Sequence, residues 1–306
     1  MILYVQGDLF QSPAQVLVNT VNTVGAMGKG VAMEFKRHFP EMYPKYRDLC
    51  EEGDFNVGSL WLYKTPNKWV LNFPTKRHWR HPSRVEYVES GLRKFVETYL
   101  TMGIHSIAFP PLGCGNGQLD FRSQVQPLME KYLNPLPIEV FVYPERENAF
   151  VEHLQPGEMS DWLRTEPQSL PFSEVWVDIE QVLEKKGEYR TVAKNNPFSA
   201  RISREPLGIH VIAAERKYLV QYDTLSSLWQ QLRSYGFSMR HIAPGINRQV
   251  SYVLSVFAEL DYVTPVNLAD DFSKFESASM IGLQILPAAF KQRSDYANSI
   301  QQLRLF

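Results

Sequence analysis

The first half of the chain alternates short apolar runs with amphipathic stretches. Residues 16–20 are mainly apolar and β-branched, as expected of a buried strand. In residues 83–102 the apolar positions recur three and four residues apart, which predicts a long amphipathic helix. Ser83 and Glu86 could form a capping box at its start. Further strands are expected at 2–6, 59–63, 69–73, 104–109 and 138–143, and further helices at 30–38 and 124–132. Strands that alternate with helices predict an α/β layer sandwich.

The pattern changes around residues 144–172, which are rich in proline, serine and charge. This composition suits a linker, so we expect a first domain at 1–150, a linker at 151–172 and a second domain at 173–306. The second domain should be α+β, with residues 251–262 open to either a helix or a strand. Its other helices are expected at 173–186 and 224–235, and its strands at 189–193, 200–203, 209–213 and 217–222.

Composition and charge narrow the class of protein. A content of 44% hydrophobic and 21% charged residues is ordinary for a globular protein, and the net charge of −1 excludes a global basic field. With only two cysteines, Cys50 and Cys114, a disulfide framework is excluded and a reducing cytosol is favoured. No signal peptide or membrane span is evident, so a cytoplasmic location without membrane contact is expected. The seven histidines lack metal-ligand spacing, so neither a metal nor a cofactor is expected.

Two glycine-rich loops follow two of the expected strands. GAMGKG at 25–30 opens a helix, and GCGNG at 113–117 follows the strand at 104–109. Glycine lets backbone amides approach a ligand, and the first amides of a helix attract anions. Two such loops facing each other would hold a diphosphate from both sides, although tight turns are the simpler alternative. Neither loop is a Walker A motif or a dinucleotide fingerprint.

Polar side chains stand where two strands end. Asp8 follows the first strand, and its carboxylate could accept a hydrogen bond from an adenine amine or could cap a turn. Asn19 and Asn22 leave the second strand, and their amides could hydrogen-bond to ribose hydroxyls or form Asx turns. The residues alone leave both alternatives open for each side chain.

The segment FPTKRHWRHPSR at 73–84 joins a strand to the long helix. Basic residues interleaved with an aromatic residue suit a phosphate backbone and a stacked base, although a solvated charged loop has the same composition. A lysine at a strand end, such as Lys76, can act as a nucleophile if its pKa is lowered. The candidate DNA-binding residues are Arg77, Trp79, Arg80 and Arg84.

Four motifs in order resemble those of macrodomains, and more closely those of the DarG-type antitoxins of DarT–DarG toxin–antitoxin systems. They are QGDLF, VNTVNTVGAMGKGVAMEFKRHFP, NFPTKRHWRHPS and PPLGCGNGQLD, and they cover residues 1 to about 150. The resemblance implies a macrodomain, a three-layer α/β/α sandwich with a mixed sheet that binds ADP-ribose at its strand ends. It also implies that the second domain, at 173–306, binds the toxin.

The resemblance assigns roles to individual residues. Lys76 and Asn22 become the candidate catalytic residues. The candidate ADP-ribose-binding residues are Asp8, Leu9, Asn19, Thr20, Gly28, Lys29, Gly30, Val31, Ala32, Thr75, Gly113, Cys114, Gly115, Asn116 and Gly117. Related hydrolases use a lysine in a TKK-type motif, matched by Thr75-Lys76-Arg77, and an aspartate directly after GCGL. Here Asn116 and Gly117 follow GCG instead, and Asp120 comes three residues later.

The expected function is therefore an antitoxin that hydrolyses ADP-ribose from thymidine bases of single-stranded DNA and also binds the cognate DarT-type toxin. The implied partners are this toxin, ADP-ribosylated single-stranded DNA and ADP-ribose. Two alternatives are a non-catalytic reader of ADP-ribose or modified DNA and a purely stoichiometric toxin inhibitor. An acidic stripe in the second half could imitate DNA phosphates or could be a solvated face; it comprises Glu259, Asp261, Asp270 and Asp271.

Overall fold

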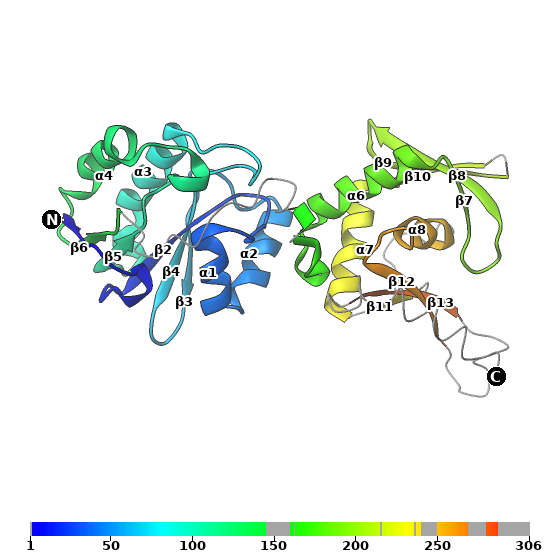
Figure 1. The fold of residues 1–306 in the computed structure, drawn as a ribbon, viewed down its shortest axis with the longest axis horizontal. Coiled ribbons are helices and arrows are strands. Elements are labelled where there is room, and N and C mark those ends of the chain that lie inside the picture. The colour runs from blue at the N-terminus through cyan, green and yellow to red at the C-terminus, as the bar shows by residue number, and fades with distance from the viewer. Residues whose placement is uncertain are drawn as a thin grey trace. The chain divides into compact units, whose positions relative to one another are not determined.

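The chain forms two compact units, Met1–Ser160 and Asp161–Phe306 (Figure 1). The computed structural model describes residues 2–144, 160–161, 163–214, 216–235, 237–239, 250–268 and 280–286. Each unit has its own sheet and helices, and each is described separately below.

The first unit is built on a six-stranded mixed sheet in the order β1-β6-β5-β2-β4-β3. Neighbouring strands run parallel except for β3, which is antiparallel to β4 across a short hairpin. The strands are β1 (Ile2–Tyr4), β2 (Val16–Val21), β3 (Trp61–Lys64), β4 (Trp69–Pro74), β5 (Ser106–Phe109) and β6 (Glu139–Val142). Because β2, β4 and β5 are parallel, the segments that follow them all leave the same edge of the sheet.

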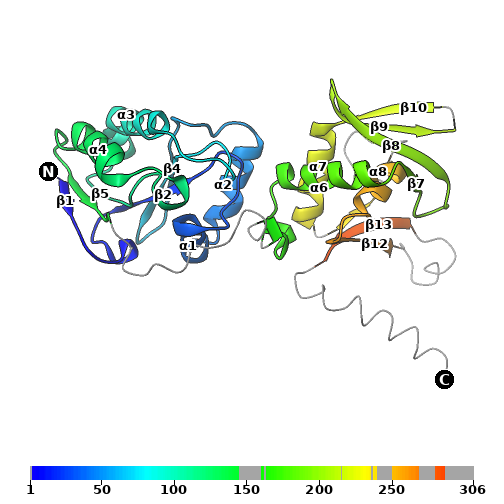
Figure 2. The ribbon, with the colours of Figure 1, turned by 45° about the horizontal axis from the view of Figure 1, so that its top comes forward.

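Helices cover both faces of this sheet (Figure 2). On one face, α3 (Val85–Met102) and α4 (Gln126–Leu133) bury a cluster centred on Phe73, Phe95 and Phe109. On the other face, α1 (Gly30–His38) and α2 (Met42–Glu51) bury a second cluster. Single turns complete the unit at η1 (Leu9–Gln11), η2 (Gly115–Gly117) and the π-helical η3 (Phe121–Val125). The predicted three-layer α/β/α sandwich with a mixed sheet is confirmed.

Two local expectations about helices were wrong. Helix α2 was not expected, because Pro40 and Pro44 looked like breaks in the pattern. Pro44 lies in the first turn of α2, where a proline costs no intrahelical hydrogen bond. The long helix begins at Val85 rather than at residue 83, and its N-cap is Arg84, which makes no side-chain cap bond. The capping box with Ser83 therefore does not form.

The second unit is α+β and contains two antiparallel sheets, ordered β10-β9-β8-β7 and β11-β13-β12. Its strands are β7 (Glu188–Arg190), β8 (Pro197–Arg204), β9 (Leu207–Ala213), β10 (Arg216–Gln221), β11 (Phe237–Met239), β12 (Val263–Leu268) and β13 (Met280–Ile285). Its helices are α6 (Phe172–Lys185), α7 (Tyr222–Tyr235) and α8 (Val250–Phe257), so the ambiguous segment at 251–262 begins as a helix.

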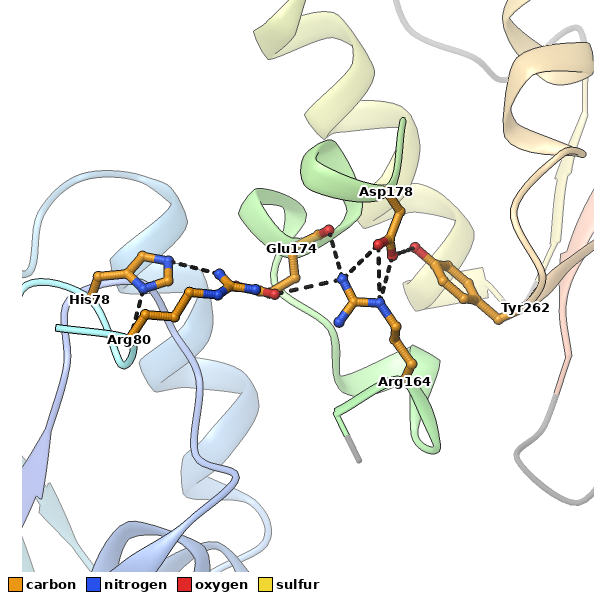
Figure 3. A network of polar contacts seen from close by, with 6 residues as sticks. All are labelled: His78, Arg80, Arg164, Glu174, Asp178 and Tyr262. Carbon is orange, nitrogen blue, oxygen red and sulfur yellow. Dashed lines mark hydrogen bonds and ion pairs between the residues drawn. The ribbon is translucent and has the colours of Figure 1, made fainter. Parts of the chain in front are cut away.

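The C-terminal part of the expected linker packs into the second unit. Leu163 and Leu170 are buried there, and η4 (Pro167–Ser169) leads into α6. The Arg164 guanidinium donates to Asp178 on α6 at 2.6 and 2.9 Å, and the Tyr262 hydroxyl donates to the same carboxylate at 2.8 Å (Figure 3). Burial raises the pKa of Tyr262 well above its ordinary value, so this hydroxyl stays a donor.

The acidic stripe is only partly described by the structure. Glu259 pairs with Lys186 at 2.7 Å, which leaves less of its charge for a partner, whereas Asp261 is exposed. Asp270 and Asp271 lie outside the described residues. Within the residues the structure describes, no helix has both the length and the apolar character needed to cross a membrane.

Gly91 provides a test of the packing of α3 against the sheet. A Cβ added there would lie 2.2 Å from Cζ of the buried Phe73 ring. We expect Gly91→Ala to lower the free energy of unfolding by about 1–3 kcal/mol through overpacking, despite the better helix propensity of alanine. Thermal and urea unfolding measure this effect. Gly187→Ala is the matched control, because nothing lies within 4 Å of its added Cβ. Equal stability of the two variants would contradict the packing described here.

Candidate functional site

The segments that follow β2, β4 and β5 enclose a cleft of about 440 Å³. Both glycine loops and the 73–84 segment contribute to it, as expected from the parallel order of the strands. Of the candidate residues, the cleft is lined by Thr20, Asn22, Gly28, Lys29, Gly30, Val31, Ala32, Thr75, Lys76, Trp79, Arg80, Gly113, Cys114, Gly115, Asn116 and Gly117.

Asn22 shapes the first glycine loop. Its Oδ1 accepts from the amides of Val24 and Ala26 at 3.0 and 3.3 Å, and its Nδ2 donates to the Ala26 carbonyl at 2.6 Å. The Tyr46 hydroxyl donates to the Asn22 carbonyl at 2.7 Å, and burial raises the pKa of Tyr46 well above its ordinary value. The side chain of Asn22 thus forms an Asx turn while it also lines the cleft.

The first loop ends in helix α1, whose first turn faces the cleft. Gly30, Val31 and Ala32 open this helix and all line the cleft. The first amides of an α-helix have no partner within the helix and carry the positive end of its dipole. This wall of the cleft therefore favours a bound anion.

The second glycine loop is tightly wound. Gly113 and Gly115 have φ values of 70° and 64°, a conformation that favours glycine. The Leu119 amide donates to the Gly113 carbonyl at 3.2 Å and closes the loop. Space above Gly117 is also restricted, because an added Cβ there would lie 2.4 Å from the Ser83 Oγ. Larger residues at 113, 115 or 117 would distort this wall of the cleft.

Lys76 connects the exit of β4 to the second loop. Thr75 is buried, and its amide donates to the Val21 carbonyl at 3.0 Å, which holds the start of the segment against β2. The half-buried Lys76 then donates from Nζ to the Asn116 carbonyl at 2.5 Å. A primary amine is thus held at the second loop, in a cleft that residues of the first loop also line.

Aromatic and basic side chains form the rim of the cleft. The Arg80 guanidinium lies 4.0 Å from the centroid of the Trp79 ring, and both residues line the cleft. The Arg80 amide donates to Nδ1 of His78 at 3.2 Å, which fixes this turn (Figure 3). Arg77 and Arg84 are not among the lining residues, and their guanidinium groups lie 5.8 and 5.7 Å from the Tyr87 ring instead.

Three candidate residues for ADP-ribose do not line this cleft. Asp8 is exposed and caps η1, accepting from the Phe10 amide at 3.0 Å. Leu9 is part of the core beneath α1. Asn19 is fully buried and donates to Oδ1 of Asn72, its neighbour in β4, at 2.9 Å. In this structure Asp8 therefore caps a turn, and Asn19 forms a buried polar pair with Asn72.

Eight of the residues that line the cleft had not been selected by sequence reasoning, among them Ser83, Gln118, Pro110 and Pro111. The two prolines and Gln118 flank the GCGNG loop, so their closeness in sequence was the available signal. The position of Ser83 just before a helix was misleading, because it suggested a helix cap rather than a residue of the cleft.

The first half of this chain is similar to known proteins. The family model described as Macro domain matches residues 18–127. The DNA ADP-ribosyl glycohydrolase of Thermus aquaticus is 43% identical over 175 residues, which cover 56% of this chain and 47% of that protein. Among solved structures, the macrodomain of Thermus aquaticus DarG is 47% identical and covers 47% of this chain and 99% of that chain, with a TM-score of 0.45. Thermosipho africanus DarTG in complex with ADP-ribose is 42% identical and covers 49% of this chain and 43% of that chain, with a TM-score of 0.46.

The first half of this chain is a macrodomain. Its identity to DarG DNA ADP-ribosyl glycohydrolases lies at 40–47% over the macrodomain half. The chain spans about half the length of the curated relatives that it matches.

Asp120, which follows the second glycine loop, caps a helical turn in this macrodomain. Its carboxylate is not among the groups that line the cleft, and it accepts from the amide and hydroxyl of Ser123 at 2.8 and 2.6 Å. These hydrogen bonds lower the pKa of Asp120, which acts as the N-cap of η3.

The pKa of the nearby Cys114 thiol is shifted in the opposite direction. Burial raises the pKa of the Cys114 thiol to about 11, and the Asp120 carboxylate adds to the rise.

The macrodomain cysteines should therefore resist alkylation near neutral pH. With a pKa of about 11, the Cys114 thiol should react with iodoacetamide about 100-fold more slowly at pH 7.5 than a free cysteine. Because the Asp120 carboxylate raises this pKa, Asp120→Asn should speed the labelling of Cys114. Mass spectrometry can follow both thiols, with Cys50, whose pKa is about 12, as the internal reference. Rapid labelling of Cys114 in the parent chain would contradict this assignment.

Proposed function

We propose that the macrodomain of this chain removes ADP-ribose from thymidine bases of single-stranded DNA. The observation that carries this proposal is the position of the Lys76 amine at the second glycine loop, in a cleft that the first glycine loop also lines at the exits of parallel strands. The similarity to proteins named DNA ADP-ribosyl glycohydrolase supports the same activity.

The size and lining of the cleft support the binding of ADP-ribose. Its volume of about 440 Å³ lies within the range of small-molecule sites. The diphosphate would lie between the first turn of α1 and the Gly113–Gly117 loop, where helix amides and glycine backbone meet an anion from two sides. The distal ribose would then approach Lys76, and the Asx turn of Asn22 would fix the neighbouring wall.

The reaction replaces the bond between C1″ of the distal ribose and the thymine nitrogen with a bond to a water oxygen, and the thymine nitrogen gains a proton. Lys76 can assist in either of two ways. As a neutral amine it attacks C1″ and forms a covalent intermediate that water then hydrolyses. As an ammonium it stabilises negative charge that develops on ribose oxygens as the sugar ring opens. The Asn116 carbonyl accepts a hydrogen bond from either form.

The rim of the cleft suits the DNA side of the adduct. The indole of Trp79 offers a face for the modified base, and Arg80 supplies positive charge beside it. Arg77 and Arg84 are near enough in the chain to meet flanking phosphates. The net charge of −1 provides no general attraction between the chain and DNA, so this local positive charge would attract the DNA instead.

We propose that the second unit binds and neutralises a DarT-type toxin. Its place after the macrodomain in the chain supports this role. The chain would then counteract the toxin in two ways, by repairing the DNA and by blocking the enzyme.

The first prediction from this proposal concerns Lys76. The parent chain should release free ADP-ribose and unmodified DNA from an oligonucleotide that carries ADP-ribose on thymidine. Lys76→Ala should lower the rate at least about 100-fold, because it removes the reacting amine. Gel shift and mass spectrometry follow both products. Borohydride reduction of the parent reaction should leave ADP-ribose attached to Lys76 if the amine is the nucleophile.

The control for Lys76 is Lys94→Ala, which removes an exposed lysine from α3 outside the cleft and should keep the parent rate. Equal rates for the Lys76→Ala variant and the parent chain would contradict the catalytic role. Binding of the adduct without release by either chain would instead support the alternative of a non-catalytic reader, which the missing aspartate favours.

The second prediction separates toxin binding from hydrolysis. The full-length Lys76→Ala variant should still block ADP-ribosylation of an oligonucleotide by the cognate toxin, because the second unit is unchanged. Titration of this variant into a fixed amount of toxin should reach full inhibition near equimolar protein. Persistent toxin activity at a large excess of the variant would contradict toxin binding by this chain.

A further inference from the structure

Ser83 has an unusual environment in the macrodomain. It is 5% exposed, yet its Oγ has no hydrogen-bond partner among the described residues. The residue lines the cleft, seven positions after Lys76 in the same segment. It makes no helix cap, because α3 begins after Arg84.

The Ser83 side chain is held directly against the second glycine loop. Its amide donates to the Gly117 carbonyl at 2.9 Å, which fixes the backbone of Ser83 to the loop. A Cβ added to Gly117 would lie 2.4 Å from the Ser83 Oγ, and one added to Gly113 would lie 3.1 Å from it. The hydroxyl therefore lies at the point where the two glycines come together.

A buried hydroxyl without a partner costs stability. Alanine would keep the Cβ that packs against the loop and would not have that cost, so this packing does not require a hydroxyl. The side chain of Lys76 converges on the same place, since its Cε would lie 3.8 Å from a Cβ on Gly117. A group that enters the cleft between Lys76 and the second loop comes close to the Ser83 hydroxyl.

We propose that Ser83 is a ligand-binding residue whose hydroxyl donates a hydrogen bond to an oxygen of ADP-ribose at the Gly113–Gly117 loop. This inference rests on the proposed binding of ADP-ribose in the cleft. The glycines allow the small displacement of the loop that brings the ligand oxygen within reach of Oγ. The oxygens of a diphosphate are strong acceptors, so the bond is charge-assisted.

The experiment compares ligand affinity and fold stability in the same full-length variant. For Ser83→Ala we expect about tenfold weaker binding of free ADP-ribose, equivalent to ~1.4 kcal/mol, by isothermal titration calorimetry. The Tm without ligand should be unchanged or higher, because an unpaired buried hydroxyl has been removed. If Ser83 only supported the loop, Ser83→Ala would weaken ADP-ribose binding and lower the Tm together.

The matched control is Ser90→Ala on α3. The Ser90 Oγ also lies against a glycine, 2.5 Å from a Cβ added to Gly58, but Ser90 does not line the cleft. This variant should bind ADP-ribose like the parent chain.

Each remaining outcome has a definite meaning. Parent-like affinity in Ser83→Ala overturns the inference and leaves the proposed function intact. Weaker binding together with a clearly lower Tm, or failure to fold, assigns Ser83 a structural role and also overturns it. Absence of ADP-ribose binding by the parent chain overturns the proposed function itself.

Discussion

In the parallel pair of β2 and β4, Val16 lies opposite Trp69 and Val21 lies opposite Pro74, so both strands end at the same edge of the sheet. Strand β5 joins the same edge through its parallel pairing with β2. Both glycine loops and the 73–84 segment start from this edge. Because these three segments leave the sheet side by side, they can enclose the cleft. An antiparallel strand at β4 would send Lys76 to the opposite end of the sheet.

Hydrogen bonds between these loops turn a shared edge into a defined site. Lys76 donates to the carbonyl of Asn116, and the amide of Ser83 donates to the carbonyl of Gly117. The segment that carries the amine therefore also sets the shape of the second glycine loop. The first loop is shaped independently, by the Asx turn of Asn22 and the buried hydroxyl of Tyr46. A ligand between the loops meets one wall made by a helix N-terminus and another made by glycine backbone.

The second unit has a core of its own, with Trp229, Phe172 and Phe257 fully buried. Its entry segment is attached by the ion pair between Arg164 and Asp178 and by the Tyr262 hydroxyl (Figure 3). Removing one member of this partly buried pair leaves the other charge without its partner, so the contact holds the entry segment against α6. Composition alone placed this segment in a linker, because buried polar pairs and exposed polar residues look alike in a sequence.

The sequence by itself determined the strands of the first unit, the strands β7 to β10 of the second, most helices and the two glycine loops, because hydrophobic periodicity and glycine content are local properties. It did not determine β11, β12 and β13. It also determined the macrodomain fold, through four motifs in order. Only the tertiary structure decided which polar residues share a site. Asn19 and Asn22 are three residues apart, yet the first faces the buried Asn72 and the second lines the cleft. Ser83 looked like a helix cap and instead lies against Gly113 and Gly117. The physical reason is that side-chain partners across a sheet edge depend on strand order and register, which no local pattern contains.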